Sequence, residues 1–161
     1  MNTSGTRLAA IVGIAIVTLA LLATGLRAEP VRNKMLEDVR ISGQGPCAVI
    51  NVGFTFPVRY EKHFPLESGT ELRIQVKPIA VSPEDRNALF KREAVTAAKF
   101  DDRVPLREVV YEGDIAGGPF LTLFFARKVR FEVRTGRDFR SLSITLPGPE
   151  SGDGCEPEQA E

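Results

Sequence analysis

Apolar and polar residues alternate along several segments of this 161-residue chain, and the alternation is clearest over Gly118–Leu146. Side chains of a β-strand point to opposite faces in turn, so apolar residues at every second position predict one buried and one solvated face. Here the apolar positions are Leu121, Leu123, Phe125, Val129, Phe131, Val133, Leu142, Ile144 and Leu146. We therefore expect strands in this stretch, with Thr135–Asp138 as the turn before a returning antiparallel strand.

The first part of this stretch is too long for one ordinary strand. Its apolar residues stay at odd-numbered positions from Leu121 to Val133, across Ala126–Lys128. That tripeptide lacks the Gly, Asn or Asp of a tight hairpin, and strands usually span about 3–10 residues. The sequence predicts either a long strand with a bulge at Arg127 or an unusual turn between two strands.

Two earlier segments carry the same period. Cys47–Tyr60 places apolar side chains on one face, with Pro57 in the opposite phase at an edge or at the end of the strand. Glu71–Ile79 alternates between apolar and charged or amide residues, and a connection of about ten residues around His63–Thr70 is expected between the two. The apolar face of the first segment consists of Ala48, Ile50, Val52, Phe54, Phe56 and Val58.

One short helix is expected among the strands. Ser82 can cap it, Pro83 suits its first position, and Glu84 and Asp85 oppose the positive end of its dipole, so we predict a helix running to about Val95. Arg107–Tyr111 is a further short strand. The predicted fold class is mainly β: an antiparallel β-sandwich with one short helix, preceded by an apolar N-terminal signal or anchor helix.

The chain divides into four predicted parts. Residues 1–28 form a signal peptide or membrane anchor, 29–46 a linker in which an edge strand can start at Val39 and Ile41, 47–147 the β-sandwich domain, and 148–161 an acidic disordered tail. The uncharged run Leu8–Leu26 lies between the length of a secretory apolar region and that of a transmembrane helix. If uncleaved, residues 8–26 would hold the protein in a membrane. Either outcome makes the protein exported: periplasmic, or anchored in the inner membrane and facing the periplasm.

Composition excludes little. Apolar residues make up 43% and charged residues 26% of the chain, as in ordinary globular proteins, and the formal net charge is zero. All charges in Glu150–Glu161 are acidic. This balance gives no reason to expect a nucleic-acid partner.

Cys47 and Cys155 are the only cysteines. In an oxidising compartment two cysteines favour a disulfide, and we predict that they pair. The alternative leaves both unpaired, with Cys155 exposed.

No catalytic residues, cofactor or metal ligands are predicted. His63 is the only histidine and has no second ligand at metal-site spacing, so a surface position beside Phe64 and Pro65 is the better interpretation. Gly113–Gly118 lacks the Gly-Lys-Ser/Thr of a phosphate-binding loop, and no Ser lies in a hydrolase elbow. We do not expect an enzyme.

Basic residues crowd the strands of the Gly118–Leu146 stretch. Arg127, Lys128, Arg130 and Arg134 are the candidate anion- or partner-binding residues, and strand phase places the last three on the solvated face. Such a face suits an anionic cell-envelope polymer, a lipid surface, an acidic partner or the chain's own acidic tail, and the expected partner is an envelope protein or an anionic cell-wall polymer. A solvated strand face that opposes edge aggregation explains the same residues.

The order of strands over Cys47–Leu146, closing on GPFLTLFF and VRFEVRTGRDFRSLSITL, resembles the β-rich head domains of some proteobacterial envelope proteins. More loosely it is similar to the amidase N-terminal (AMIN) domain. This resemblance implies a β-sandwich that acts as a non-catalytic binding or adapter module associated with the cell wall. The alternative function is a structural subunit of a membrane-anchored protein assembly, which an apolar patch at Phe54, Phe56 or Phe120 would favour.

Overall fold

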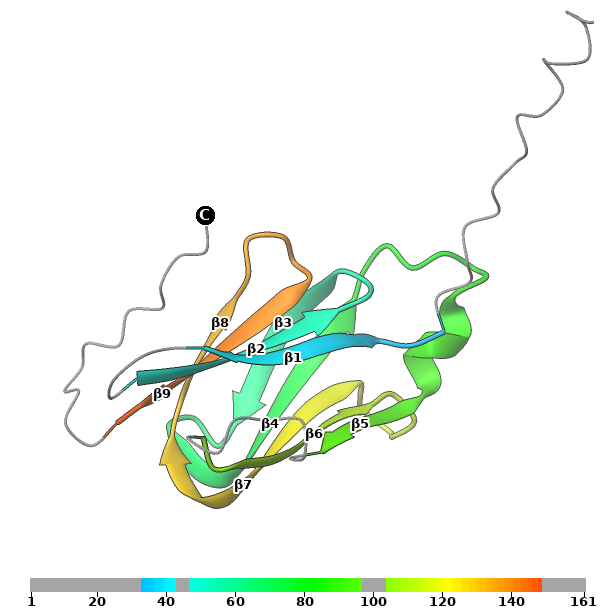
Figure 1. The fold of residues 1–161 in the computed structure, drawn as a ribbon. Coiled ribbons are helices and arrows are strands. Elements are labelled where there is room, and N and C mark those ends of the chain that lie inside the picture. The colour runs from blue at the N-terminus through cyan, green and yellow to red at the C-terminus, as the bar shows by residue number, and fades with distance from the viewer. Residues whose placement is uncertain (1–32, 43–46, 97–103, 149–161) are drawn as a thin grey trace, which may run out of the picture. The chain divides into compact units, whose positions relative to one another are not determined.

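The computed structural model describes residues 33–42, 47–96 and 104–148, which form nine strands and one short 3-10 helix (Figure 1). The strands are β1 (Leu36–Ser42), β2 (Cys47–Phe54), β3 (Val58–Phe64), β4 (Ser68–Pro78), β5 (Arg92–Thr96), β6 (Leu106–Glu112), β7 (Phe120–Arg130), β8 (Glu132–Thr135) and β9 (Ser141–Pro147), and the helix is η1 (Arg86–Phe90).

These strands form two antiparallel sheets, so the expectation of a mainly β fold is confirmed. The four-stranded sheet has the order β1-β2-β9-β8, and the five-stranded sheet has the order β3-β4-β7-β6-β5. Figure 1 shows β1, β2 and β9 lying across β4, β6 and β7. Each sheet directs one apolar face towards the other.

The core lies between these two faces, and the alternation in the sequence explains it. Ile50 and Ile144 from one sheet and Leu72 and Leu121 from the other are fully buried in a single cluster. Each such side chain stabilises the fold by about 1.5–3 kcal/mol relative to an exposed position. Other members in the predicted phase are Val52, Phe54, Phe56, Val58, Ile74, Val76, Leu123, Phe125, Phe131, Leu142 and Leu146.

The segment Cys47–Tyr60 is two strands in different sheets. The chain leaves the four-stranded sheet after Phe54 and enters the five-stranded sheet at Val58, and Pro57 lies between, so the strand ends where proline predicts. Backbone bonds hold the crossing: Phe54 N–H donates to the carbonyl of Arg140 (2.7 Å), and Val58 N–H donates to that of Phe139 (2.7 Å).

The predicted ten-residue connection before the next strand is wrong. β3 extends to Phe64 and β4 begins at Ser68, which makes them neighbours in a hairpin joined by Pro65–Glu67. Cross-strand pairing outweighs the weak local alternation at the end of β3.

The predicted helix from Ser82 to about Val95 is also wrong. Only η1 is helical, and β5 follows it and pairs with β6 in register. The Ser82 hydroxyl donates to the Asp85 carboxylate (2.8 Å) instead of capping a helix. Ala88 is the one buried residue of η1. A helix here would bury little apolar surface, whereas β5 supplies hydrogen-bond partners for the backbone of β6.

Part of the predicted 29–46 linker belongs to the domain. β1 is an edge strand of the four-stranded sheet, as the alternation of Val39 and Ile41 indicates, and it pairs with β2. The Glu93 carboxylate of β5 accepts hydrogen bonds from the backbone N–H groups of Met35 (2.6 Å) and Leu36 (2.9 Å). This carboxylate joins the start of β1 to the opposite sheet.

The long stretch after Gly118 bends as predicted. β7 runs to Arg130, and its pairing with β4 shifts register between Val129 and Phe124, a span that contains the expected bulge position, Arg127. Phe131 then lies between β7 and β8, and its N–H donates to the carbonyl of Glu67 (2.9 Å). Its buried ring stacks on Phe125 with centroids 6.4 Å apart. The chain therefore changes sheet at this residue.

Several predictions concern residues outside the described ranges. They are the signal or anchor over 1–28, the acidic tail from 149 onward and the pairing of Cys155 with Cys47, the first residue of β2. Within residues 33–42, 47–96 and 104–148, no helix has the length and hydropathy of a membrane span.

Adjacent residues Phe131 and Arg130 test the assignment of faces. Phe131→Asp should destabilise the domain by several kcal/mol, because it places an unpaired charge among buried rings. Arg130→Asp should change the unfolding free energy by less than about 1 kcal/mol, because Arg130 is exposed. Denaturant unfolding of both variants measures this, and equal losses would show that the faces are assigned wrongly.

The buried hydroxyl of Tyr111 should make the unfolding free energy depend on pH in the alkaline range. Burial, and after it the nearby Glu93 carboxylate, raises the pKa of Tyr111 well above the value near 10 of a free tyrosine. Its hydroxyl also donates to the carbonyl of Leu89 (2.9 Å). The unfolded chain therefore loses this proton first, so the stabilisation is complete below about pH 10 and declines as pH rises further, by at most about 1.4 kcal/mol per pH unit.

We expect wild type to lose more unfolding free energy between about pH 9 and pH 11 than Tyr111→Phe, whose ring cannot ionise. Denaturant melts across this range measure the difference. Parallel curves for the two proteins would contradict the assignment.

Candidate functional site

The outer face of the five-stranded sheet carries an ordered array of polar and aromatic side chains. Because Leu72, Ile74 and Val76 of β4 face the core, the alternate residues of that strand face outward. Strand register places outward residues in rows across the sheet. One row contains Lys62, Gln75, Phe120, Glu112 and Arg92, and the next contains Phe64, Arg73, Thr122, Val110 and Ala94.

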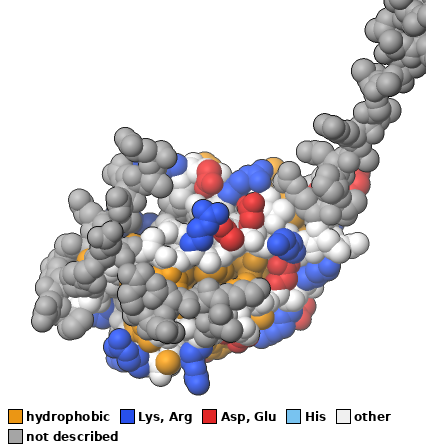
Figure 2. All heavy atoms as spheres, viewed as in Figure 1, with side chains coloured by type: hydrophobic (Ala, Val, Ile, Leu, Met, Phe, Trp, Pro, Cys, Tyr) orange, Lys and Arg blue, Asp and Glu red, His pale blue; other side chains and the backbone are white. Residues whose placement is uncertain are grey.

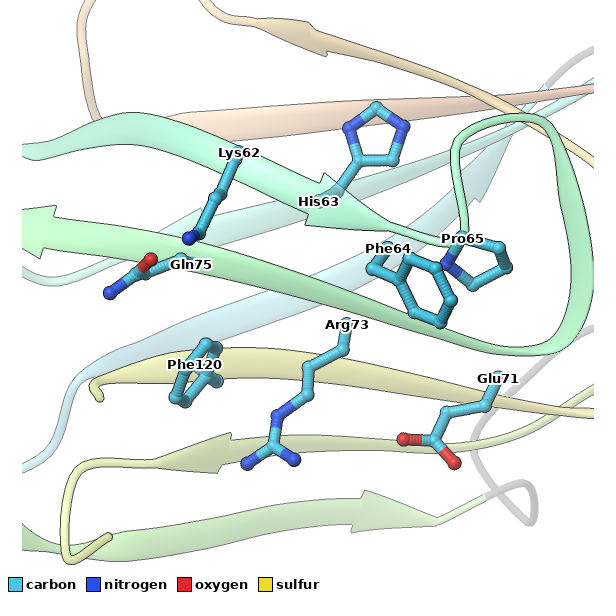
Figure 3. Close-up of a pocket in the computed structure, with 8 residues that line it drawn as sticks. All are labelled: Lys62, His63, Phe64, Pro65, Glu71, Arg73, Gln75 and Phe120. Atoms are coloured by element: carbon cyan, nitrogen blue, oxygen red, sulfur yellow. The ribbon is translucent and has the colours of Figure 1, made fainter. Parts of the chain in front are cut away.

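A groove of about 330 Å³ lies on this face, over β3, β4 and the start of β7 (Figure 3). Its volume is at the lower end of the range for ligand sites, roughly 300–1,000 Å³. The lining residues are Lys62, His63, Phe64, Pro65, Glu71, Arg73, Gln75 and Phe120.

Two aromatic rings give the groove its apolar surface. Phe64 is 77% exposed, which is unusual for a large apolar side chain. Phe120 contributes the second ring, and the guanidinium carbon of Arg73 lies 4.2 Å from its centroid, a cation–π contact. In Figure 3, Lys62 lies near Gln75 at one end of the groove and Glu71 lies at the other.

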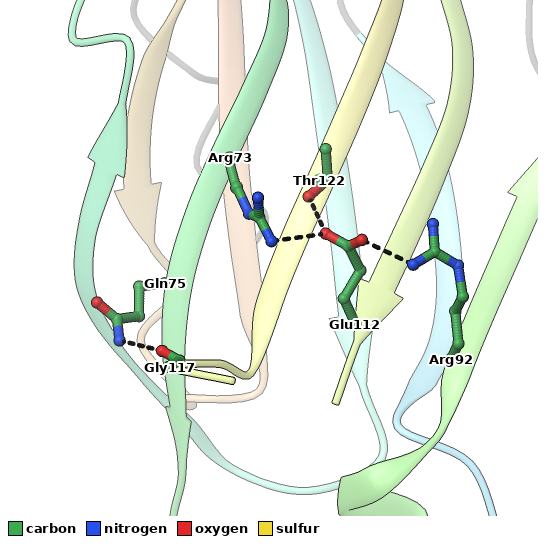
Figure 4. Close-up of polar contacts among 6 residues, drawn as sticks. All are labelled: Arg73, Gln75, Arg92, Glu112, Gly117 and Thr122. Carbon is green, nitrogen blue, oxygen red and sulfur yellow. Dashed lines mark hydrogen bonds and ion pairs between the residues drawn. The ribbon is translucent and has the colours of Figure 1, made fainter. Parts of the chain in front are cut away.

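Arg73 is held in place by Glu112 (Figure 4). The Glu112 side chain is only 12% exposed, and its carboxylate accepts a hydrogen bond from the Thr122 hydroxyl (2.8 Å). Arg92 forms an ion pair with it at 2.8 Å, and Arg73 forms a longer one at 3.4 Å. A nearly buried carboxylate with three partners restricts the orientation of Arg73 at the floor of the groove.

A hydrogen bond also fixes the Gln75 side chain in the groove, and Arg73 has one hydrogen-bond donor without a partner in the described part of the chain. The Gln75 amide donates to the carbonyl of Gly117 (2.8 Å), which holds this side chain against the loop before β7 (Figure 4). The Nε atom of Arg73 is buried, and no described residue accepts its hydrogen bond. Buried donors are normally paired, so this N–H is an unusual feature of the floor.

His63 is engaged by its surroundings. Its Nδ1 atom lies 2.7 Å from the Tyr60 hydroxyl, and its Nε2 atom lies 3.0 Å from the carbonyl oxygen of Leu66. The ring also packs edge-on against Phe131, with centroids 6.3 Å apart. These contacts support a structural role for His63, in a half-buried position rather than on the open surface.

The predicted basic residues do not form one sheet face. Arg127, Lys128 and Arg130 are exposed at the end of β7, whereas Arg134 belongs to β8 of the other sheet and pairs with Glu132 (2.8 Å). On the side of the molecule that Figure 2 shows, Lys and Arg side chains are interspersed with Asp and Glu. The alternation in the sequence continues past Phe131 and therefore predicts that Lys128, Arg130 and Arg134 share one face. Because the chain changes sheet at Phe131, Arg134 lies on a different sheet from the other two.

The predicted apolar patch is also revised. Phe54 and Phe56 are buried in the core, and only Phe120 of the three lies at the groove. In the described part of the chain, no group of three or more His, Cys, Asp or Glu side chains is arranged to hold a metal ion.

Sequence reasoning missed the groove. Alternation alone assigns the outward residues of β4 to a solvated face, and the predicted connection around His63–Thr70 contains Phe64 and Pro65. One indication was available: Phe120 and Phe124 occupy the phase that was expected to be solvated. Aromatic residues on an outward face indicate a surface that is more than a solvated strand.

Comparisons with protein-family models, curated proteins and solved structures find no match to this chain.

Glu112 should contribute to stability through its charge. Glu112→Gln keeps the shape of the side chain but weakens both arginine pairs, and we expect a loss of about 1 kcal/mol in unfolding free energy, since the arginines are partly solvated. Glu37→Gln on exposed β1 is the matched control and should be neutral. Denaturant unfolding of the two variants checks this, and equal stability would mean that the network around Glu112 is not stabilising.

Proposed function

We propose that this chain is a non-catalytic binding or adapter module of the cell envelope, built as a β-sandwich, and that the groove on the five-stranded sheet is its binding site. The observation that carries this proposal is Phe64, an exposed aromatic ring beside a guanidinium that Glu112 and Phe120 hold in place. Binding surfaces are enriched in aromatic residues and arginine, and a preorganised site loses less entropy on binding.

The cellular setting of this proposal comes from the sequence. The uncharged run Leu8–Leu26 suits a signal peptide or an anchor, so the protein would be periplasmic or held in the inner membrane facing the periplasm. The expected partner is an envelope protein or an anionic cell-wall polymer. The resemblance to β-rich envelope head domains suits the same role.

A structural subunit of a membrane-anchored assembly is the second candidate function. It is supported by Leu66, which is 72% exposed and lies two residues after Phe64, itself 77% exposed. Two neighbouring apolar side chains in water favour a protein contact over a polymer contact.

Affinity capture from an envelope extract tests the proposed site, with the full-length protein in non-ionic detergent as bait. Phe64→Ser should reduce recovery of specific partners about tenfold, because it removes an aromatic anchor of the groove. The matched control is Phe90→Ser, since Phe90 is 68% exposed on η1 and does not line the groove. This control should leave recovery unchanged.

A third bait, in which three basic residues are reversed in charge, tests whether the partner binds those residues instead of the groove. Lys128→Glu, Arg130→Glu and Arg134→Glu together reverse the basic residues of β7 and β8. Retention of partners by this bait, with loss by Phe64→Ser, supports the groove. The opposite pattern would contradict the groove and assign binding to the basic residues, with the salt dependence expected of exposed charges.

A further inference from the structure

The two ends of the groove carry opposite charges. Lys62 lies opposite Gln75, Phe64 lies opposite Arg73, and Glu71 lies two residues further along β4. The order along the strand is therefore a cation, an aromatic centre and an anion (Figure 3). From Gln75 to Glu71 the distance along the strand is about 13 Å, at roughly 3.3 Å per residue.

The charges of Lys62 and Glu71 at the two ends of the groove are available to a ligand, whereas the charge of Arg73 at the centre is not. Arg73 is paired with Glu112 and stacked on Phe120, so it presents a flat, largely neutralised surface. Lys62 and Glu71 are exposed, and neither forms an ion pair with another residue of the described ranges. A ligand is thus favoured when it brings a negative group to Lys62 and a positive group to Glu71.

The size of the groove favours a single inserted side chain at the centre. Its volume of about 330 Å³ is small for a ligand site, and Phe64 is the ring at its centre, opposite Arg73.

An extended polypeptide matches this spacing. Alternate residues of an extended chain face the same side and lie about 6.6 Å apart, so residues i, i+2 and i+4 span about 13 Å. An acidic residue, an apolar residue and a basic residue at these positions would meet Lys62, the Phe64 ring and Glu71 in turn.

The neighbouring sheet edge is a poorer docking place. β3 has a register shift between Tyr60 and Lys62, and Arg59 and Glu61 form an ion pair at 2.9 Å beside it. Bulges and charges of this kind are the usual protection of an edge strand against pairing. The face of the sheet is therefore favoured over its edge.

We propose that the groove binds an extended segment of a partner protein in which an acidic, an apolar and a basic residue occupy alternate positions. This inference rests on the proposed function, because it names the partner chemistry of the same groove. Complementary charges at the two ends provide selectivity, and the apolar residue provides most of the affinity.

Capped pentapeptides test the pattern against the full-length protein in non-ionic detergent micelles, with amide NMR shifts as the readout. Ac-Glu-Ser-Leu-Ser-Lys-NH2 should bind and shift the amides of Lys62, Phe64, Arg73 and Phe120. Replacing its Leu by Ser should weaken binding about tenfold. Giving both ends the same charge should weaken binding about two- to fivefold, the range that an exposed ion pair supports.

A charge reversal in the protein provides the sharper test. Lys62→Glu should make Ac-Lys-Ser-Leu-Ser-Lys-NH2 the preferred peptide, because both ends of the groove are then acidic. Lys77→Glu makes the same charge change on the outward face of β4, at an exposed residue that does not line the groove, and should leave the preference unchanged. An unchanged preference in Lys62→Glu would overturn the inference.

The outcomes separate this inference from the proposed function. If capture depends on Phe64 but no peptide binds, or all peptides bind equally, the partner is not a segment of this pattern and the inference is wrong while the binding site stands. A captured polysaccharide or lipid would have the same consequence. If capture ignores Phe64→Ser, the proposed function itself is wrong at this site.

Discussion

The two apolar sheet faces are stable only against each other, and the rest of the structure follows from bringing them together. Each strand buries every second side chain against the opposite sheet. The free energy gained by this burial offsets the conformational entropy that the chain loses on folding, and it would be lost if either face were left in water. The chain must therefore cross between sheets. It does so at Pro57 and at Phe131, and at both crossings backbone hydrogen bonds replace the pairing that the strands give up.

The crossings also determine which outer face can carry a site. The hairpin of β3 and β4 and the start of β7 become neighbours only in the five-stranded sheet, where they place Lys62, Phe64, Arg73 and Phe120 around one groove. Glu112 of β6 is the nearly buried carboxylate that orients the floor. Rigid strands thus hold the proposed site, which loops could hold only with a larger loss of entropy on binding.

Much of the fold could be predicted from local patterns. The core phase of β2, β4, β7 and β9, the end of a strand near Pro57, the bend near Arg127 and the turn before β9 all follow from alternation and turn chemistry. The errors fall where local preference is weak. Ser82–Asp85 has the composition of a helix start, but the following residues include too few buried side chains to support a helix, and pairing with β6 makes Arg92–Thr96 a strand.

The sequence by itself determined which side of each main strand is apolar, because the two faces of a strand depend only on the succession of its own residues. The tertiary structure decided which strands are neighbours, and with that the groove and the separation of Arg134 from Arg130. Partner choice depends on hydrogen bonding between strands that are far apart in the chain and on burial shared by both sheets. No local period contains that information.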